Sequence, residues 1–530
     1  MTDRKRFFIS TLIVGIASLL SRVLGLLRST LLASFYGATE SAGLADCYQA
    51  SFTLPDIIYN LIVLGAISIV LVPYFSASIQ NKDNNDLDTK SSALLNFFFL
   101  LISLFSITAW VFAPFFVKEL LIRGWTDQTK IDLTIKLTRI MLLQPIFMSL
   151  SGILGAYINS KEKYTSYSLA MLSYNVGIIG GIVFLSGPFG IEGVAWGTVI
   201  GSFLQFSIQA AGVFMTGFKY KLILPRFNKE FCDLFLIAIP RIIAIGSEQF
   251  VRFFFTYLGS FIFTGSIIIF SYAENFSMVP FGMVAVSLST TAFPVFSKLF
   301  AENKFDTMLF SLFDTLRMLL FFIVPITIIM MILRFEIIDI LLGYNKFSSN
   351  DTMITANALL TYMIGIPFYS ITIVLAKYFY AQKKTFEPMI ISLISSAITV
   401  LVCFILVKKL PATMGVTGLT IGRSTGYALQ AILLFYMLFI EGKYRNLYRT
   451  YPYKDYFQIG KIVVINAGLL AVGLTIKLAI PPFFSGKLLS LFSISIIGLI
   501  CGIYYISASF LFKIPELEVF NRMFRKLKNR

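Results

Sequence analysis

The sequence predicts an all-α polytopic membrane protein with about 14 transmembrane helices. Of its 530 residues, 57% are hydrophobic and 13% are charged, which is roughly half the charged share of a soluble protein. Apolar runs long enough to cross a hydrocarbon core as a helix recur from end to end. The predicted spans are residues 7–27, 43–76, 92–117, 133–158, 165–186, 191–216, 231–259, 264–297, 311–333, 352–381, 386–407, 416–440, 459–479 and 487–512.

An internal repeat predicts the domain organisation. Four short motifs recur in the same order about 222 residues further along the chain. They pair Val72–Ser76 with Phe293–Ser297, Gln144–Phe147 with Ile366–Tyr369, Ala156–Lys163 with Tyr378–Thr385, and Gly190–Gly197 with Gly415–Gly422. Because each repeat has an even number of spans, we expect two parallel six-helix lobes, 1–216 and 230–440. A basic cytoplasmic linker, 217–229, would join them, and 441–530 would add two helices and a basic cytoplasmic tail.

Small residues favour close helix approach in several spans. Glycines occur between Gly177 and Gly181 and again between Gly193 and Gly201, which predicts close helix packing.

Two similar lobes can also rock about a central cleft, which would give alternating access to the two membrane faces.

The net charge of +17 is a topology signal. With the N-terminus inside, roughly 25 Lys and Arg residues fall on the cytoplasmic side and roughly 9 on the other. We therefore expect both termini in the cytoplasm, with membrane lipids as partners and no nucleic acid.

The composition argues against catalytic activity, so we expect a transporter rather than an enzyme. The chain contains no histidine, and its four cysteines are far apart; no metal site and no cofactor are therefore expected. No ATP-binding signature appears, and no polar link is long enough to form a separate domain.

Arg22 and Arg28 are the strongest candidates for ligand binding. They interrupt and end the first apolar span, where a guanidinium is costly unless it faces a polar cavity or a partner. A guanidinium suits a diphosphate, because its planar fork donates two hydrogen bonds and stays charged. The alternatives are that Arg28 snorkels to the headgroups and that Arg22 forms a structural pair with Asp46. Asp46 could equally be a counter-charge in the empty cavity.

A second group of polar residues could line the same cavity. It consists of Asn60, Arg252, Glu274 and Asn275. Glu248 and Arg252 are four residues apart, which favours an ion pair on one helix face.

Several motifs resemble the MurJ/MviN-type lipid II flippases, a family within the multidrug/oligosaccharidyl-lipid/polysaccharide exporter superfamily. The resemblance covers essentially the whole chain and rests on Ser21–Arg28, Phe35–Gly37, Ala45–Asp46, Leu54–Asp56, Gly65–Ser68, Val72–Pro73, Tyr272–Asn275, Gly343–Phe347 and Phe379–Thr385.

This resemblance implies a function in peptidoglycan biosynthesis and cell shape. The family moves an undecaprenyl-diphosphate-linked disaccharide–pentapeptide from the inner to the outer leaflet of the bacterial plasma (inner) membrane, and its members are V-shaped alternating-access transporters. It implies that Arg22 and Arg28 correspond to two arginines of a cationic cavity, and Asp46 to its acidic residue. It also implies an undecaprenyl-diphosphate-linked glycan lipid as partner, with cell-wall synthesis proteins as further partners.

The chain departs from the family pattern at two arginine positions. Tyr59 and Asn60 stand where the family usually has an arginine, and Ala273-Glu274-Asn275 replaces Ala-Asp-Arg. Either other cations such as Arg252 compensate, or the lipid-linked substrate differs. The alternatives are an exporter of another polyprenyl-linked saccharide or of a small cation and, from a different class, a membrane glycosyltransferase or a non-transporting scaffold.

Overall fold

A computed structural model describes residues 3–61, 84–161, 164–225, 229–440, 453–479 and 486–517. Within these ranges every regular element is helical. The chain divides into two compact units, Met1–Ile268 with Tyr344–Ser348, and Ile269–Gly343 with Ser349–Arg530. Most of the predicted second span, from residue 62 on, lies outside the described residues, as do 441–452 and the tail from 518.

The first unit contains the helices up to α12, together with the first residues of α13. In the labels used here, η marks a 3₁₀ or π turn. The elements are α1 (Asp3–Tyr36), η1 (Ser41–Gly43), α2 (Leu44–Ser51), α3 (Thr53–Tyr59), α5 (Asn84–Val111), α6 (Ala113–Phe115), η3 (Phe116–Leu121), α7 (Gln128–Met141), α8 (Gln144–Ser160), α9 (Tyr164–Gly180), η4 (Gly181–Leu185), α10 (Ser186–Phe189), α11 (Ile191–Phe214) and α12 (Lys229–Gly259).

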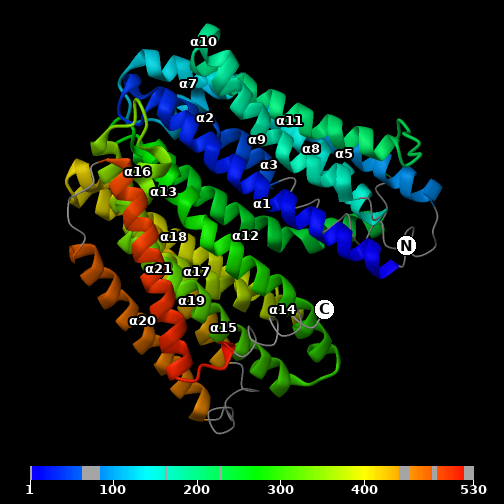
Figure 1. Cartoon of the computed structure of the whole chain (residues 1–530). Coiled ribbons are helices and arrows are strands. Elements are labelled where there is room, and N and C mark those ends of the chain that lie inside the picture. The colour runs from blue at the N-terminus through cyan, green and yellow to red at the C-terminus, as the bar shows by residue number, and fades with distance from the viewer. Residues whose placement is uncertain are drawn as a thin grey trace. The chain divides into compact units, whose positions relative to one another are not determined.

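Long helices of the first unit lie side by side, with α9 between α1 and α11 (Figure 1). α9 and α11 approach so closely at Gly177 that a Cβ atom there would stand 2.2 Å from the Cα of Gly201. The predicted small-residue packing is therefore confirmed for this helix pair. Leu94 and Phe98 of α5 form an apolar core with Ile153 and Tyr157 of α8.

The second unit contains most of α13 and the helices after it. Its elements are α13 (Ser266–Pro280), η5 (Phe281–Ala285), α14 (Val286–Ala301), α15 (Phe305–Ile332), α16 (Arg334–Leu342), α17 (Ser349–Ala381), α18 (Phe386–Lys409), η6 (Ala412–Met414), α19 (Gly415–Ile440), α20 (Tyr453–Ala479) and α21 (Lys487–Leu511).

In the second unit, α17 packs against α15 and α19 (Figure 1). The π turn η5 follows Pro280, whose ring cannot donate the backbone hydrogen bond of a regular helix. α20 and α21 attach to α15 and α16 through two apolar clusters, one around Phe321 and Ile465 and the other around Ile332 and Leu469. The two last helices therefore belong to the second unit.

The predicted fold class is confirmed, but the predicted count of 14 spans is not. Twelve helices within the described residues are long and apolar enough to cross a membrane, and they overlap twelve of the predicted spans. The other two predictions are 43–76 and 231–259. The first begins as the short helices α2 and α3, and the second lies on α12, which carries Asp233, Arg241 and Glu248.

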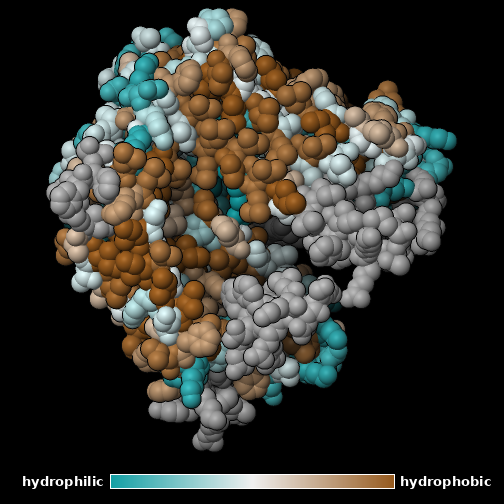
Figure 2. All heavy atoms as spheres, in the orientation of Figure 1, coloured by the Kyte–Doolittle hydropathy of each residue, from teal (hydrophilic) through white to brown (hydrophobic). Residues whose placement is uncertain are grey.

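Apolar side chains cover most of the visible surface of the helices, and hydrophilic ones gather mainly near the helix ends (Figure 2). The exposed large residues include Leu104, Ile107 and Phe184 in the first unit and Val463, Leu478 and Leu499 in the second. Such surfaces are stable against lipid tails and not against water.

Candidate functional site

Hydrogen bonds to α9 fix the orientation of α1. The Ser21 hydroxyl donates to the Met171 carbonyl at 3.1 Å, and the Asn175 amide donates to the Ser21 carbonyl at 3.2 Å. A Cβ atom at Gly25 would lie 3.9 Å from the Asn175 amide oxygen, so the small residues of α1 face α9. Val23 and Leu27 are exposed.

Arg22 and Arg28 are both half-buried on this helix. Six residues separate them, so they differ by about 120° around the helix and by about 9 Å along it. Neither guanidinium makes a hydrogen bond or an ion pair with any residue that the structure describes. The structural pair between Arg22 and Asp46, which was the alternative to ligand binding, is therefore not formed.

Tyr48 and Tyr174 each lie within electrostatic reach of Arg28 and of Asp56. The charges of Arg28 and Asp56 both act on the hydroxyls of Tyr48 and Tyr174. We call Arg28, Tyr48, Asp56 and Tyr174 the Arg28 cluster. Four elements, α1, α2, α3 and α9, contribute one residue each.

Hydrogen bonds hold both tyrosines of the Arg28 cluster in place. The Tyr48 hydroxyl lies 2.9 Å from that of Thr198 on α11, and the Tyr174 hydroxyl accepts a bond of 3.2 Å from the Gln144 amide on α8. Two polar side chains from other helices thus position these tyrosines. The sequence prediction included Arg28 and missed Tyr48 and Tyr174. The signal that could have found them is a tyrosine within or beside an apolar segment, because a buried hydroxyl needs a hydrogen-bond partner.

Asp46 lies in a different environment, fully buried on α2. Its carboxylate accepts hydrogen bonds from the backbone N–H groups of Gly265 at 2.6 Å and Ile268 at 2.8 Å. These groups belong to the first turn of α13, where four N–H groups lack helical partners and the helix dipole favours a negative charge. Asp46 thus caps α13 from a helix more than 200 residues earlier in the chain.

The loop directly before α13 requires a glycine. Gly265 has φ +103°, and a Cβ atom there would stand 2.8 Å from the Ala38 carbonyl oxygen. A side chain would therefore be strained by both the backbone conformation and the contact. Lys130 lies close enough to Asp46 for their charges to attract.

The other predicted residues are distributed over both units. Asn60 is half-buried at the end of α3, and Arg252 is exposed on α12; both belong to the first unit. In the second unit, Glu274 is 8% exposed on α13, whereas Asn275 beside it is exposed.

Glu274 belongs to a buried polar cluster of the second unit. It accepts a 3.2 Å hydrogen bond from the Tyr362 hydroxyl, which lies 3.4 Å from the Tyr427 hydroxyl. The guanidinium of Arg423 stacks 4.4 Å from the Tyr427 ring. We call these four residues the Glu274 cluster. It surrounds its charged groups with aromatic side chains from α17 and α19.

Neither cluster has the composition of a metal site. Within the described residues, no group of three or more His, Cys, Asp or Glu side chains could hold a metal ion. The Arg28 cluster combines a guanidinium and two hydroxyl groups with the carboxylate of Asp56. Its guanidinium and hydroxyl donors suit the oxygen atoms of an anionic ligand.

Comparisons with known proteins identify relatives along most of the chain. A family model described as "Lipid II flippase MurJ" matches residues 32–497. A probable lipid II flippase MurJ from Buchnera aphidicola subsp. Schizaphis graminum is 26% identical over 530 residues, covering 98% of this chain and 99% of the relative. A probable lipid II flippase MurJ from Rhizobium tropici is 25% identical over 443 residues, covering 81% and 80%.

Solved structures show the same fold. A lipid II flippase MurJ in an inward closed conformation has a TM-score of 0.77 and 27% identity, and the match covers 95% of this chain and 99% of the other. An inward-facing MATE-family multidrug transporter of the MOP superfamily has a TM-score of 0.63 at 15% identity, with 79% and 93% covered. The second likeness concerns the fold alone.

Proposed function

Since the chain belongs to the MurJ family of lipid II flippases, we propose that it flips lipid II by alternating access and that Arg22 and Arg28 bind the substrate's diphosphate. It is a multi-pass membrane protein of a bacterial transporter family. On this proposal the work is done by binding and lobe movement, without a catalytic residue or a cofactor.

The observation that carries the proposal is that neither guanidinium has a hydrogen-bond or ion-pair partner among the residues that the structure describes. A charged side chain inside a membrane protein usually pairs with another group, because desolvation is expensive. Arg22 and Arg28 are half-buried in a transmembrane helix and make no hydrogen bond or ion pair with a described residue. Their donors are therefore available to a ligand that brings its own negative charge.

The chemistry of the ligand follows from these donors. A diphosphate loses its hydration when it enters a cavity, and charge-assisted hydrogen bonds from guanidinium groups replace that hydration. The separation of about 9 Å along α1 suits two contacts made in succession or on different oxygens of one headgroup. The Tyr174 hydroxyl, which accepts from Gln144 and keeps its own proton, adds a neutral donor beside Arg28.

The direction of movement agrees with the membrane potential. With the inside negative, outward movement of one negative charge across the full field is favoured by about 2.3 kcal/mol per 100 mV.

On this proposal both termini are cytoplasmic, the protein lies in the inner membrane, and cell-wall synthesis proteins use its product.

We assign Asp46 the role of holding the start of α13. Asn60 and Arg252 of the first unit and Glu274 and Asn275 of the second stay secondary candidates. Asp46 already receives two backbone hydrogen bonds, so its charge contributes to the fold on which the site depends. The arginines absent at Tyr59, Asn60 and Asn275 place more of the binding on Arg22 and Arg28.

The test is replacement of the resident lipid II flippase in a depletion strain. The parent chain should restore growth and the exposure of lipid II to an external probe, and Arg22→Ala and Arg28→Ala should not. Arg123→Ala is the matched control, because Arg123 is exposed between α6 and α7. Failure of a stably inserted parent chain would mean another substrate. Full activity of both arginine variants would reject the assigned site.

A further inference from the structure

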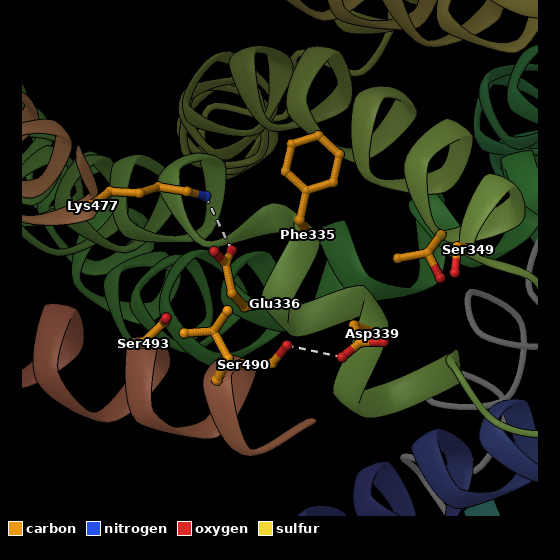
Figure 3. A pocket seen from close by; sticks show the side chains of 9 residues that line it. Phe335, Glu336, Asp339, Ser349, Lys477, Ser490 and Ser493 are labelled. Atoms are coloured by element: carbon orange, nitrogen blue, oxygen red, sulfur yellow. Dashed lines mark hydrogen bonds and ion pairs between the residues drawn. The ribbon is translucent and has the colours of Figure 1, made fainter. Parts of the chain in front are cut away.

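A cavity of about 360 Å³ lies in the second unit, where the ends of four helices meet. Its walls come from α16, the start of α17, the end of α20 and the start of α21 (Figure 3). Its polar lining includes Glu336, Asp339, Lys477, Ser490 and Ser493. The volume is in the range of small-molecule sites and far exceeds what a bare metal ion fills.

The cavity carries both signs of charge. On one wall, α16 contributes the carboxylates of Glu336 and Asp339 (Figure 3). Lys477 approaches from α20, with its ammonium 3.1 Å from Glu336 Oε2 and 2.5 Å from the Ile332 carbonyl oxygen. Lys487, at the start of α21, is close enough for its charge to act on Asp339.

Hydroxyl groups face these charges. Ser490 donates a 2.8 Å hydrogen bond to Asp339 Oδ2 (Figure 3). Ser493, one turn further along α21, lines the same cavity and is 4% exposed. Its hydroxyl makes no hydrogen bond to any residue that the structure describes. The hydroxyl lines the cavity, so it can bond to a ligand there without giving up an internal partner.

The surface beside the cavity is apolar. Leu478, next to Lys477, is 87% exposed, and Leu488 and Leu491, beside Ser490, are 69% and 51% exposed. These residues lie at the ends of candidate membrane spans. A ligand of this cavity therefore has hydrocarbon-compatible surface directly next to its polar contacts, which is the arrangement of a lipid headgroup and its tails.

We propose that this cavity binds the headgroup of a zwitterionic phospholipid that joins a phosphate to a primary ammonium. The ammonium of the lipid lies at Asp339 with the hydroxyls of Ser490 and Ser493. Its phosphate lies toward the ammonium of Lys477. A primary ammonium donates three hydrogen bonds, which carboxylate and hydroxyl oxygens accept. A trimethylated ammonium has none to donate, so the cavity discriminates between ethanolamine and choline headgroups.

The test is lipid binding by the full chain, purified in detergent, stripped of lipid and measured by native mass spectrometry. Dioleoyl phosphatidylethanolamine should bind about tenfold more tightly than dioleoyl phosphatidylcholine, a difference of about 1.4 kcal/mol. Equal binding of the two lipids would overturn the proposal. Soluble phosphoethanolamine that bound as tightly as the lipid would overturn the assignment to a lipid.

Two variants and a control locate the binding. Asp339→Asn should abolish the preference for ethanolamine, and Ser493→Ala should weaken ethanolamine-lipid binding about threefold with unchanged thermal stability. Ser495→Ala is the control, since Ser495 is exposed on the same helix and donates only to the Leu491 carbonyl. If Ser493→Ala binds the lipid like the parent and Ser495→Ala, the headgroup does not occupy this cavity.

Discussion

Arg28 and Asp46 are charged residues of the same unit with opposite surroundings. The guanidinium of Arg28 is half-buried and makes no hydrogen bond or ion pair within the described residues. The carboxylate of Asp46 is fully buried and receives two backbone N–H groups from the start of α13. One charge is available to a ligand, and the other is satisfied by the fold.

This difference distinguishes a charge that binds a ligand from a charge that stabilises the fold. Both residues are expensive to place in an apolar segment, so both look functional in the sequence. In the structure, the desolvation cost of Asp46 is offset because its carboxylate stabilises a loop and the start of a helix. Within the described residues no comparable contact compensates Arg28, which is why we assign it to the substrate.

Arg28→Ala should produce the largest effect on transport. Losing two charge-assisted hydrogen bonds to a diphosphate costs about 3 kcal/mol, which lowers flipping about a hundredfold. Arg28→Lys should retain part of the activity, because it keeps the charge but not the planar fork. Flipping in proteoliposomes and thermal stability in detergent should be measured together. An equal loss of stability would place Arg28 with Asp46, as a structural residue.

Asp46→Ala should chiefly reduce stability. It leaves the N–H groups of Gly265 and Ile268 without their acceptor, at a cost of about 2–4 kcal/mol. We expect a thermal midpoint lower by several degrees and a several-fold drop in membrane abundance, with near-normal flipping per folded molecule. Asp132→Ala is the control, because Asp132 is exposed and accepts only from the nearby Gln128 amide. If the Asp46→Ala protein is inactive but normally stable, Asp46 belongs to the substrate site.

Tyr174→Phe should have a smaller effect on transport. The change removes one hydroxyl beside Arg28 and leaves the Gln144 amide without that acceptor. One neutral hydrogen bond is worth about 1 kcal/mol, so flipping should fall about threefold to fivefold. Tyr436→Phe, on an exposed tyrosine of α19, should leave the flipping rate unchanged. A matching result for the two variants would remove Tyr174 from the Arg28 cluster.

The sequence was sufficient for the fold class, while the assignment of the arginines to the substrate stays a prediction. Helices crossing the membrane follow from apolar length alone, and twelve candidate spans overlap predictions. Arg22 and Arg28 stand out because charges are rare in such runs. The roles of Asp46 and Tyr174 could not be predicted, since their partners, Gly265 and Gln144, are distant in sequence and meet them only after packing.

Glu274→Gln in the second unit should have the smallest effect, and it extends the comparison to the other unit. Glutamine keeps an oxygen that can accept from Tyr362, so the hydrogen bond survives in neutral form. We therefore expect flipping within about twofold of the parent and a modest change in thermal stability, because neutral hydrogen bonds differ from charged ones by about 1 kcal/mol. A tenfold or greater loss of flipping in stable protein would show that the Glu274 charge itself is needed. The Glu274 cluster would then be functional like Arg28, although it is buried among aromatic side chains like a structural element.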